Sequence, residues 1–137
     1  MNLGESRKEW DTYFEEGSVL EAVAENTDIV WMKTKDYKPL NFTKRDVVYH
    51  RSIHMMPDGS ILVIGKSTQY FKQPEIKGVA RMDLKVGGWM IEPTEEGTLL
   101  TFLCQVDYQG TPALLKAISK EHTLTIYRIQ KLLEKRK

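Results

Sequence analysis

The chain has 137 residues, with 20 basic and 19 acidic side chains and a formal net charge of +1. This length predicts one domain over residues 1–137, and a hydrophobic content of 41% is enough to bury a core. The charge balance lacks the basic footprint of nucleic-acid-binding proteins. No apolar run approaches the ~20 residues of a membrane span, and the polar N-terminus does not resemble a signal peptide, so we expect a cytoplasmic protein.

The first third of the chain predicts three short elements and a loop. Residues 5–16 carry aromatic side chains at helix-like spacing, which predicts a short helix or an irregular turn. Residues 18–25 fit a helix or a strand equally well, whereas 28–34 contain Ile, Val, Trp and Thr and favour a strand. Residues 36–44 contain a proline and no clean periodicity, so we expect a loop there.

The middle of the chain predicts a series of antiparallel strands. Residues 46–55 alternate in the manner of a strand, and a Pro-Asp-Gly turn joins them to a second strand over 60–70. Residues 79–92 are long and β-like, with a bulge or bend expected at Gly87-Gly88. The last strand is expected over 98–108.

A long amphipathic helix is expected to end the chain. Thr111 is suited to cap it and Pro112 to occupy its first position. Apolar side chains then recur at steps of three and four over about five turns. This stripe comprises Leu115, Ile118, His122, Ile126, Ile129 and Leu133. Strands followed by one helix predict an α+β fold, with a curved antiparallel sheet packed on the helix.

Cys104 is the only cysteine, which excludes an internal disulfide. It lies in an apolar run, so we expect a small buried hydrophobic side chain. A catalytic thiol would need a histidine close by in the fold, and sequence alone does not place one. The chain has no Gly-rich phosphate loop, no Gly-x-Ser-x-Gly motif and no His/Cys cluster with zinc spacing. The residues therefore give no support for a zinc site.

Four segments resemble the START family of lipid-transfer domains. They are RKEWD (7–11), KRDVVYHR (44–51), QPEIKGVARMDLKVGGWMIEP (73–93) and LTFLCQVDYQGTP (100–112). Their Arg-Asp-Val, Pro-x-x-x-Gly-Val-x-Arg and Asp-x-x-Gly motifs occur in the family's order and spacing. The resemblance implies a helix-grip fold, in which the last helix closes a tunnel around a phospholipid, sterol or fatty-acyl compound. It also implies lipid exchange at a membrane, without catalytic residues or a cofactor.

The chain differs from the family pattern in two ways. A full START domain has a helix, three strands and a further helix ahead of the RKEWD-like segment, where this chain begins, so we expect an N-terminally shortened domain. An open sheet edge and an exposed apolar face would then favour a homodimer, a segment supplied by a partner, or weak stability. Sterol-carrying members pair a cavity arginine with an acid on the preceding strand. Arg51 matches the arginine, but Met32 occupies the aligned acid position, which predicts that the pair is missing and argues against a sterol.

The candidate ligand-binding residues come from this resemblance and from strand alternation. Arg51 shares a strand face with Val47 and Tyr49, and we expect it to contact the polar end of the ligand, with a structural ion pair as the alternative. Arg81 and Asp83 share a strand face, and they could instead form a structural pair. The alternative for the other candidates is an ordinary core position. The full set is Arg51, Tyr49, Trp31, Met32, Arg81, Asp83, Trp89, Phe102, His122 and Ile126.

The loop before Arg45 contains Pro39, Leu40 and Phe42. In the START family this loop lies near the tunnel mouth, so the resemblance implies a lid. An exposed Leu40 and Phe42 could enter a membrane during lipid exchange. The alternative is a loop that packs on the body. Asp46, just after this loop, is expected to cap a turn or to pair with a neighbour.

Three classes of function remain open. The leading hypothesis is a non-catalytic lipid-binding or lipid-transfer module. The second is a cavity enzyme such as a polyketide cyclase or aromatase, for which His122 and Asp83 are the only candidate acid or base groups. The third is a regulatory interaction domain whose cavity is vestigial and packed shut by Trp31, Trp89 and Met90.

Overall fold

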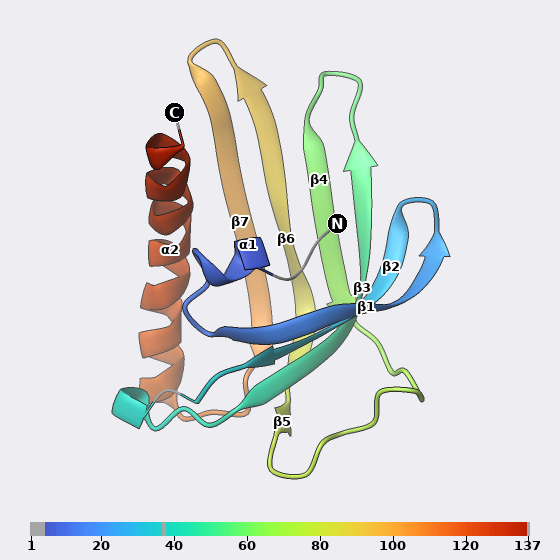
Figure 1. Cartoon of the computed structure of the whole chain (residues 1–137), viewed down its shortest axis with the longest axis vertical. Coiled ribbons are helices and arrows are strands. Elements are labelled where there is room, and N and C mark those ends of the chain that lie inside the picture. The colour runs from blue at the N-terminus through green and yellow to red at the C-terminus, as the bar shows by residue number, and fades with distance from the viewer. Residues whose placement is uncertain (1–4, 37, 137) are drawn as a thin grey trace.

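A computed structural model describes residues 5–36 and 38–136, except for the side chains of Glu5 and Leu40 (Figure 1). The described elements are α1 (Glu5–Lys8), β1 (Phe14–Ala24), β2 (Thr27–Thr34), the 3₁₀ turn η1 (Lys38–Leu40), β3 (Arg45–Met55), β4 (Ile61–Ser67), β5 (Ala80–Arg81), β6 (Asp83–Thr94), β7 (Gly97–Asp107) and α2 (Pro112–Lys135). The expected α+β class is confirmed, with a curved antiparallel sheet and one long C-terminal helix.

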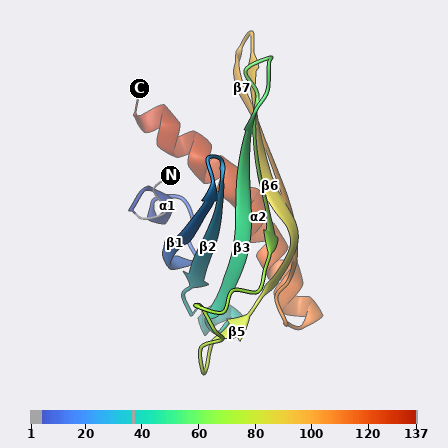
Figure 2. The same cartoon turned by 90° about the vertical axis from the view of Figure 1, so that its right-hand side faces the viewer.

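Six of these strands form the antiparallel sheet, in the order β1-β2-β3-β4-β6-β7. The two-residue strand β5 pairs in parallel with β3. The sheet curves so strongly that β1 and β2 run across the direction of β6 and β7 in Figure 1. Helix α2 lies alongside β7 and runs diagonally past it (Figure 2).

The segment 18–25, which the sequence leaves open between helix and strand, is part of β1. Its register against β2 shifts at three points, and most of its side chains are exposed. These irregularities break the alternation that would mark a strand in the sequence. A turn at Glu25-Asn26 joins β1 to β2, and the Asn26 side-chain amide donates to the Ile53 carbonyl at 3.0 Å.

The bulge expected at Gly87-Gly88 lies elsewhere. Strands β6 and β7 stay in register through both glycines, and the shift falls between Leu84 and Val86. A Cβ at Gly88 would lie 2.1 Å from the backbone oxygen of Val63. Glycine is therefore needed because β4 and β6 approach closely there.

Two apolar clusters hold the sheet and the helix together. The first contains Val30, Val47, Tyr49 and Met82, and the second contains Phe42, Leu114 and Ile118. Tyr108 packs against both clusters and so links them.

Helix α2 begins as the sequence predicts but buries only part of the predicted stripe. The Thr111 side chain accepts a hydrogen bond from the Leu114 backbone N–H at 3.3 Å, and Pro112 occupies the first turn. Ile118 is buried, whereas Leu115 and Leu133 are 38% and 54% exposed. None of the described helices is long and apolar enough to span a bilayer.

The carboxylate of Asp46 is fully buried on the face of the sheet opposite these clusters. It accepts from the Trp31 indole N–H at 2.9 Å and from the Arg81 Nε at 2.7 Å. Arg81 also donates to the backbone oxygens of Gln73 and Pro74 at 3.3 and 3.1 Å. The carboxylate thus connects β2, β3, β5 and the loop between β4 and β5.

This network tests two sequence-based expectations. Of the two roles expected for Asp46, it does not cap a turn but pairs with a neighbour in space, Arg81, which is 35 residues away in the chain. Arg81 does not pair with Asp83, which instead forms an exposed ion pair with Lys85.

We predict that Asp46→Ala lowers the free energy of unfolding by about 3–5 kcal/mol, because it leaves a partly buried guanidinium without its carboxylate. The control is Asp83→Ala, which removes a half-exposed ion pair and should cost less than about 1 kcal/mol. Urea unfolding of both variants measures the difference. Equal small losses would show that the Asp46 network does not hold the loop and β5 in place.

Candidate functional site

A row of aromatic rings lies on the concave face of the sheet. The Trp10 ring packs edge-on against Trp89 with centroids 6.0 Å apart, and Trp89 lies 4.4 Å from Phe102. Phe102 in turn meets the imidazole of His122 edge-on at 5.7 Å. The row therefore joins the segment after α1 to β6, β7 and α2.

A groove of about 270 Å³ lies between β7 and the N-terminal half of α2. Its apolar wall includes Val106, Leu115 and Ile118. The complete lining is Cys104, Gln105, Val106, Tyr108, Leu115, Ile118, Ser119 and His122. Of the candidate residues from the sequence, only His122 lines this groove.

Three polar side chains of the groove interact with one another. The Tyr108 hydroxyl and the His122 Nε2 are hydrogen-bonded at 2.9 Å. Burial raises the pKa of the Cys104 thiol, and a hydrogen bond with Tyr108 opposes this only in part. Burial raises the pKa of Tyr108 far above its usual range and lowers that of His122. All three groups are therefore neutral near pH 7, and the groove holds no thiolate nucleophile.

Arg51 lies on the concave face, as the alternation predicts, but it has a carboxylate partner. Its Nε and Nη2 atoms donate to the two carboxylate oxygens of Asp28 at 2.9 and 2.5 Å. Asp28 is the direct cross-strand neighbour of Arg51, whereas Met32 lies opposite Val47. The expectation that the charge pair is missing was therefore wrong, because the acid precedes the aligned position by four residues.

The sheet separates the other candidate residues into two groups. Tyr49 and Met32 face the concave side, where the Tyr49 hydroxyl lies 3.3 Å from the Met32 sulfur. Trp31 and Arg81 point to the opposite face, where both bind Asp46. They do not line the concave wall to which the sequence assigned them.

Two further candidates have simpler surroundings. Asp83 is half-exposed beside Lys85, so it does not form a catalytic pair with His122. Ile126 is partly buried on α2, one turn after His122.

The proposed lid is packed on the body of the protein. Phe42 is only 4% exposed and packs against Leu114, Ile118 and the ring of Tyr13, whose centroid is 5.6 Å away. The burial of Phe42 agrees with the alternative of a loop that packs on the body and excludes the exposed Phe42 that membrane entry would need. Pro39 is exposed in η1, and the side chain of Leu40 lies outside the described residues.

Arg45 fastens this loop to the end of β7. Its guanidinium is buried and lies 4.6 Å from the centroid of the Phe42 ring. It donates to the backbone oxygens of Thr43 at 2.6 Å and Tyr108 at 3.2 Å. Since these acceptors are neutral, burial lowers the pKa of Arg45.

The described residues contain no group of three or more His, Cys, Asp or Glu side chains that could hold a metal ion. The site consists instead of an apolar groove, neutral hydrogen-bonding groups and, farther along the concave face, the Arg51–Asp28 pair.

Comparison with known proteins gives consistent matches. A sequence model of the START domain matches residues 1–128. The Arabidopsis thaliana protein "ENHANCED DISEASE RESISTANCE 2-like" is 29% identical over 116 residues, which make up 80% of this chain and 16% of the plant protein. This chain therefore spans a small part of that relative.

Two human structures share the fold. Human StAR-related lipid transfer protein 5 matches with a TM-score of 0.86 and 17% identity, over 97% of this chain and 66% of that one. The lipid transfer and protein localization domain of human StarD13 (DLC2) matches with a TM-score of 0.79 and 23% identity, over 91% of this chain and 64% of that one. The chain thus spans just under two thirds of either structure.

We predict that His122 makes stability depend on pH. Burial lowers its pKa below the usual value of 6.5, so the unfolded chain binds this proton more readily than the folded chain. The stabilisation is fully present above pH 6.5 and declines as the pH falls from 6.5 through the lowered folded pKa. Urea unfolding between about pH 5 and 8 should show this decline in the wild type but not in His122→Gln.

The control for this measurement is His54→Gln, at an exposed position of β3. It should keep the decline of the wild type. An unchanged pH profile in His122→Gln would show that the buried imidazole does not control it.

Proposed function

Since the chain belongs to the START domain family, we propose that it binds one lipid, or another apolar molecule, in the groove between β7 and α2. The observation that carries the proposal is the lining of this groove. Apolar side chains form its wall, and the hydrogen-bonded Tyr108 and His122 lie among them. Ligand sites of this kind combine a mostly apolar surface with a few polar groups that fix orientation.

Apolar burial would supply most of the affinity, at about 25 cal/mol per Å² removed from water. The neutral Tyr108 and His122 favour a hydroxyl or carbonyl group as the polar end of the ligand, because neither carries a charge to offset an anion. The volume of about 270 Å³ lies at the lower limit for a small-molecule site. A full lipid would therefore need the groove to widen.

Widening would involve a shift of α2 away from the sheet. Near its start, α2 is held by Leu114 and Ile118 against Phe42, and near its end by an exposed ion pair between Arg136 and Glu9 at 2.8 Å. An exposed pair of this type contributes little stability. Because Phe42 packs directly on α2, movement of the helix and of the loop before β3 would be coupled.

Arg51 remains a candidate contact for the polar end of a ligand that reaches farther along the concave face. Its pair with Asp28 is of the kind that the START resemblance associates with sterol-carrying members. The argument against a sterol therefore loses its basis, and sterols belong among the ligands to be tested.

One alternative function has an observation in its favour. The rings of Trp10, Trp89 and Phe102 pack on one another on the concave face, as they would in a regulatory domain with a closed cavity, whereas Trp31 lies on the opposite face. Such a domain would bind no lipid in the groove. An enzyme is less well supported, because the thiol and phenol beside His122 stay protonated.

A homodimer would involve the outer edge of β7, the last strand in the described sheet order. Unpaired N–H and C=O groups on an edge strand favour pairing with another strand.

We predict that Ser119→Trp lowers ligand uptake about tenfold or more, because Ser119 lines the groove and an indole would occupy much of its volume. The matched control is Lys120→Trp, which adds the same ring at an exposed helix position outside the groove. Uptake is measured with fluorescent sterol, phosphatidylcholine and fatty-acid probes. Equal uptake by both variants, or none by the wild type, would contradict binding in this groove.

A further inference from the structure

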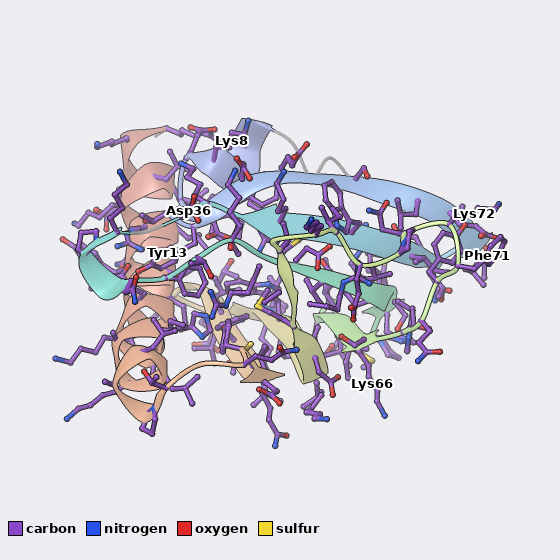
Figure 3. The ribbon with its side chains drawn as sticks, turned by 90° about the horizontal axis from the view of Figure 1, so that it is seen from below. Lys8, Tyr13, Asp36, Lys66, Phe71 and Lys72 are labelled. Atoms are coloured by element: carbon purple, nitrogen blue, oxygen red, sulfur yellow. The ribbon has the colours of Figure 1, made fainter. Side chains whose placement is uncertain are left out.

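The loop between β4 and β5 carries an aromatic ring that the protein does not bury. Phe71 is 85% exposed, and Ile76 in the same loop is 38% exposed. Figure 3 shows Phe71 and Lys72 pointing away from the body on the side opposite α2. A phenylalanine this exposed loses the free energy that burial of its ring would provide.

The loop holds Phe71 outward through hydrogen bonds on both sides of it. The Gln73 N–H donates to the Tyr70 carbonyl at 3.0 Å, which closes a tight turn with Phe71 and Lys72 at its two central positions. The Tyr70 hydroxyl donates to Glu21 of β1 at 2.5 Å, and Arg81 binds the Gln73 and Pro74 carbonyls from the other side. The ring therefore projects from a fixed turn.

The charges around the ring are suited to an anionic surface. The Lys72 ammonium lies 5.5 Å from the Phe71 ring centroid. The loop also contains the exposed Lys77, and its one acidic residue is Glu75. The nearby carboxylates are Glu75 and Glu21, and Glu21 is hydrogen-bonded to the Tyr70 hydroxyl. A ring beside a lysine is an arrangement that places apolar atoms among acyl chains and an ammonium group among anionic headgroups.

The position of the loop relates it to the groove. In Figure 1 the β4–β5 loop, η1 and the N-terminal end of α2 all lie at the lower end of the molecule, whereas the β3–β4 and β6–β7 hairpins lie at the upper end. The groove opens beside the N-terminal half of α2. The loop and the groove therefore lie toward the same end of the molecule, with Phe71 itself on the side opposite α2 (Figure 3).

We propose that the β4–β5 loop docks this protein on an anionic bilayer, with Phe71 inserted at the interface and Lys72 and Lys77 against the headgroups. The proposal deepens the lipid-binding function, since it names the surface that would meet a donor or acceptor membrane. It replaces Phe42, which is buried, as the aromatic side chain that enters the bilayer.

Flotation of the full chain with vesicles tests the docking. Vesicles of phosphatidylcholine alone are compared with vesicles in which part of it is replaced by phosphatidylserine. We expect the wild type to partition more strongly onto the second kind. Phe71→Ser should lower partitioning about tenfold, and Lys72→Gln about fivefold on the anionic vesicles only, from about 1 kcal/mol per basic side chain.

The matched control is Met55→Ser, which removes a side chain that is 78% exposed at the β3–β4 hairpin. It should partition like the wild type. Unchanged partitioning of Phe71→Ser, an equal loss in Met55→Ser, or no binding of the wild type to either vesicle would overturn the proposal. The first of these outcomes would favour a protein partner for the exposed Phe71 ring.

Measuring bound lipid in the same samples separates this proposal from the proposed function. Phe71→Ser should retain the lipid uptake of the wild type. A chain that docks through Phe71 but takes up no lipid would contradict only the proposal that the groove binds lipid. A chain that takes up lipid without docking would contradict only the proposal that the β4–β5 loop binds the bilayer.

Discussion

The buried carboxylate of Asp46 determines how the two faces of the sheet are used. A buried carboxylate is stable only with donors around it, and here an indole N–H and the guanidinium of Arg81 supply them. Because Arg81 also binds backbone oxygens of the loop between β4 and β5, the loop is held across the convex side of β2 and β3. The concave side is then the face that remains for α2 and for a ligand.

The same arrangement fixes the direction of the neighbouring side chains. Asp46 and Val48 point to the convex side, so strand alternation turns Val47, Tyr49 and Arg51 to the concave side. Val47 and Tyr49 belong to the apolar cluster that also contains Val30 and Met82. Arg51 is stabilised on this face by Asp28, which stands directly opposite on β2. A charged group and an apolar cluster thus share one continuous surface.

The groove follows from incomplete coverage of this surface. Helix α2 packs closely at Leu114 and Ile118, whereas Leu115 stays partly exposed. Cys104, Tyr108 and His122 line the gap between the helix and β7, where a molecule that enters would contact them. Burial keeps these groups neutral, which favours recognition of a lipid over covalent chemistry.

Local sequence signals predicted most of the fold. The proline-led helix with its Thr111 cap, the hairpin over residues 46–70 and the α+β class all follow from patterns within a few residues of one another. Strand β1 was ambiguous because its bulges interrupt the alternation. The glycines of β6 marked an unusual position in the strand, which the sequence pattern attributed to a bulge. The actual cause is the close approach of β4, which is a contact between segments far apart in the chain.

The site was less predictable, because it depends on register and on the tilt of α2. Asp28 and Met32 are both on the strand before Arg51, and only the cross-strand pairing decides which of them is its partner. The apolar character of Phe42 is compatible with a lid or a core, and its burial depends on where α2 begins. Tyr108 could have been found from the sequence, since it lies inside the Asp-x-x-Gly motif ahead of the helix.

Native mass spectrometry of the purified full chain, followed by denaturing extraction and identification of any bound lipid, tests the central claim most directly. The account predicts a complex of one lipid per chain whose ligand carries a hydroxyl or carbonyl group at its polar end. A chain that is free of lipid, and that stays free after incubation with sterol, phosphatidylcholine and fatty acid, would contradict it.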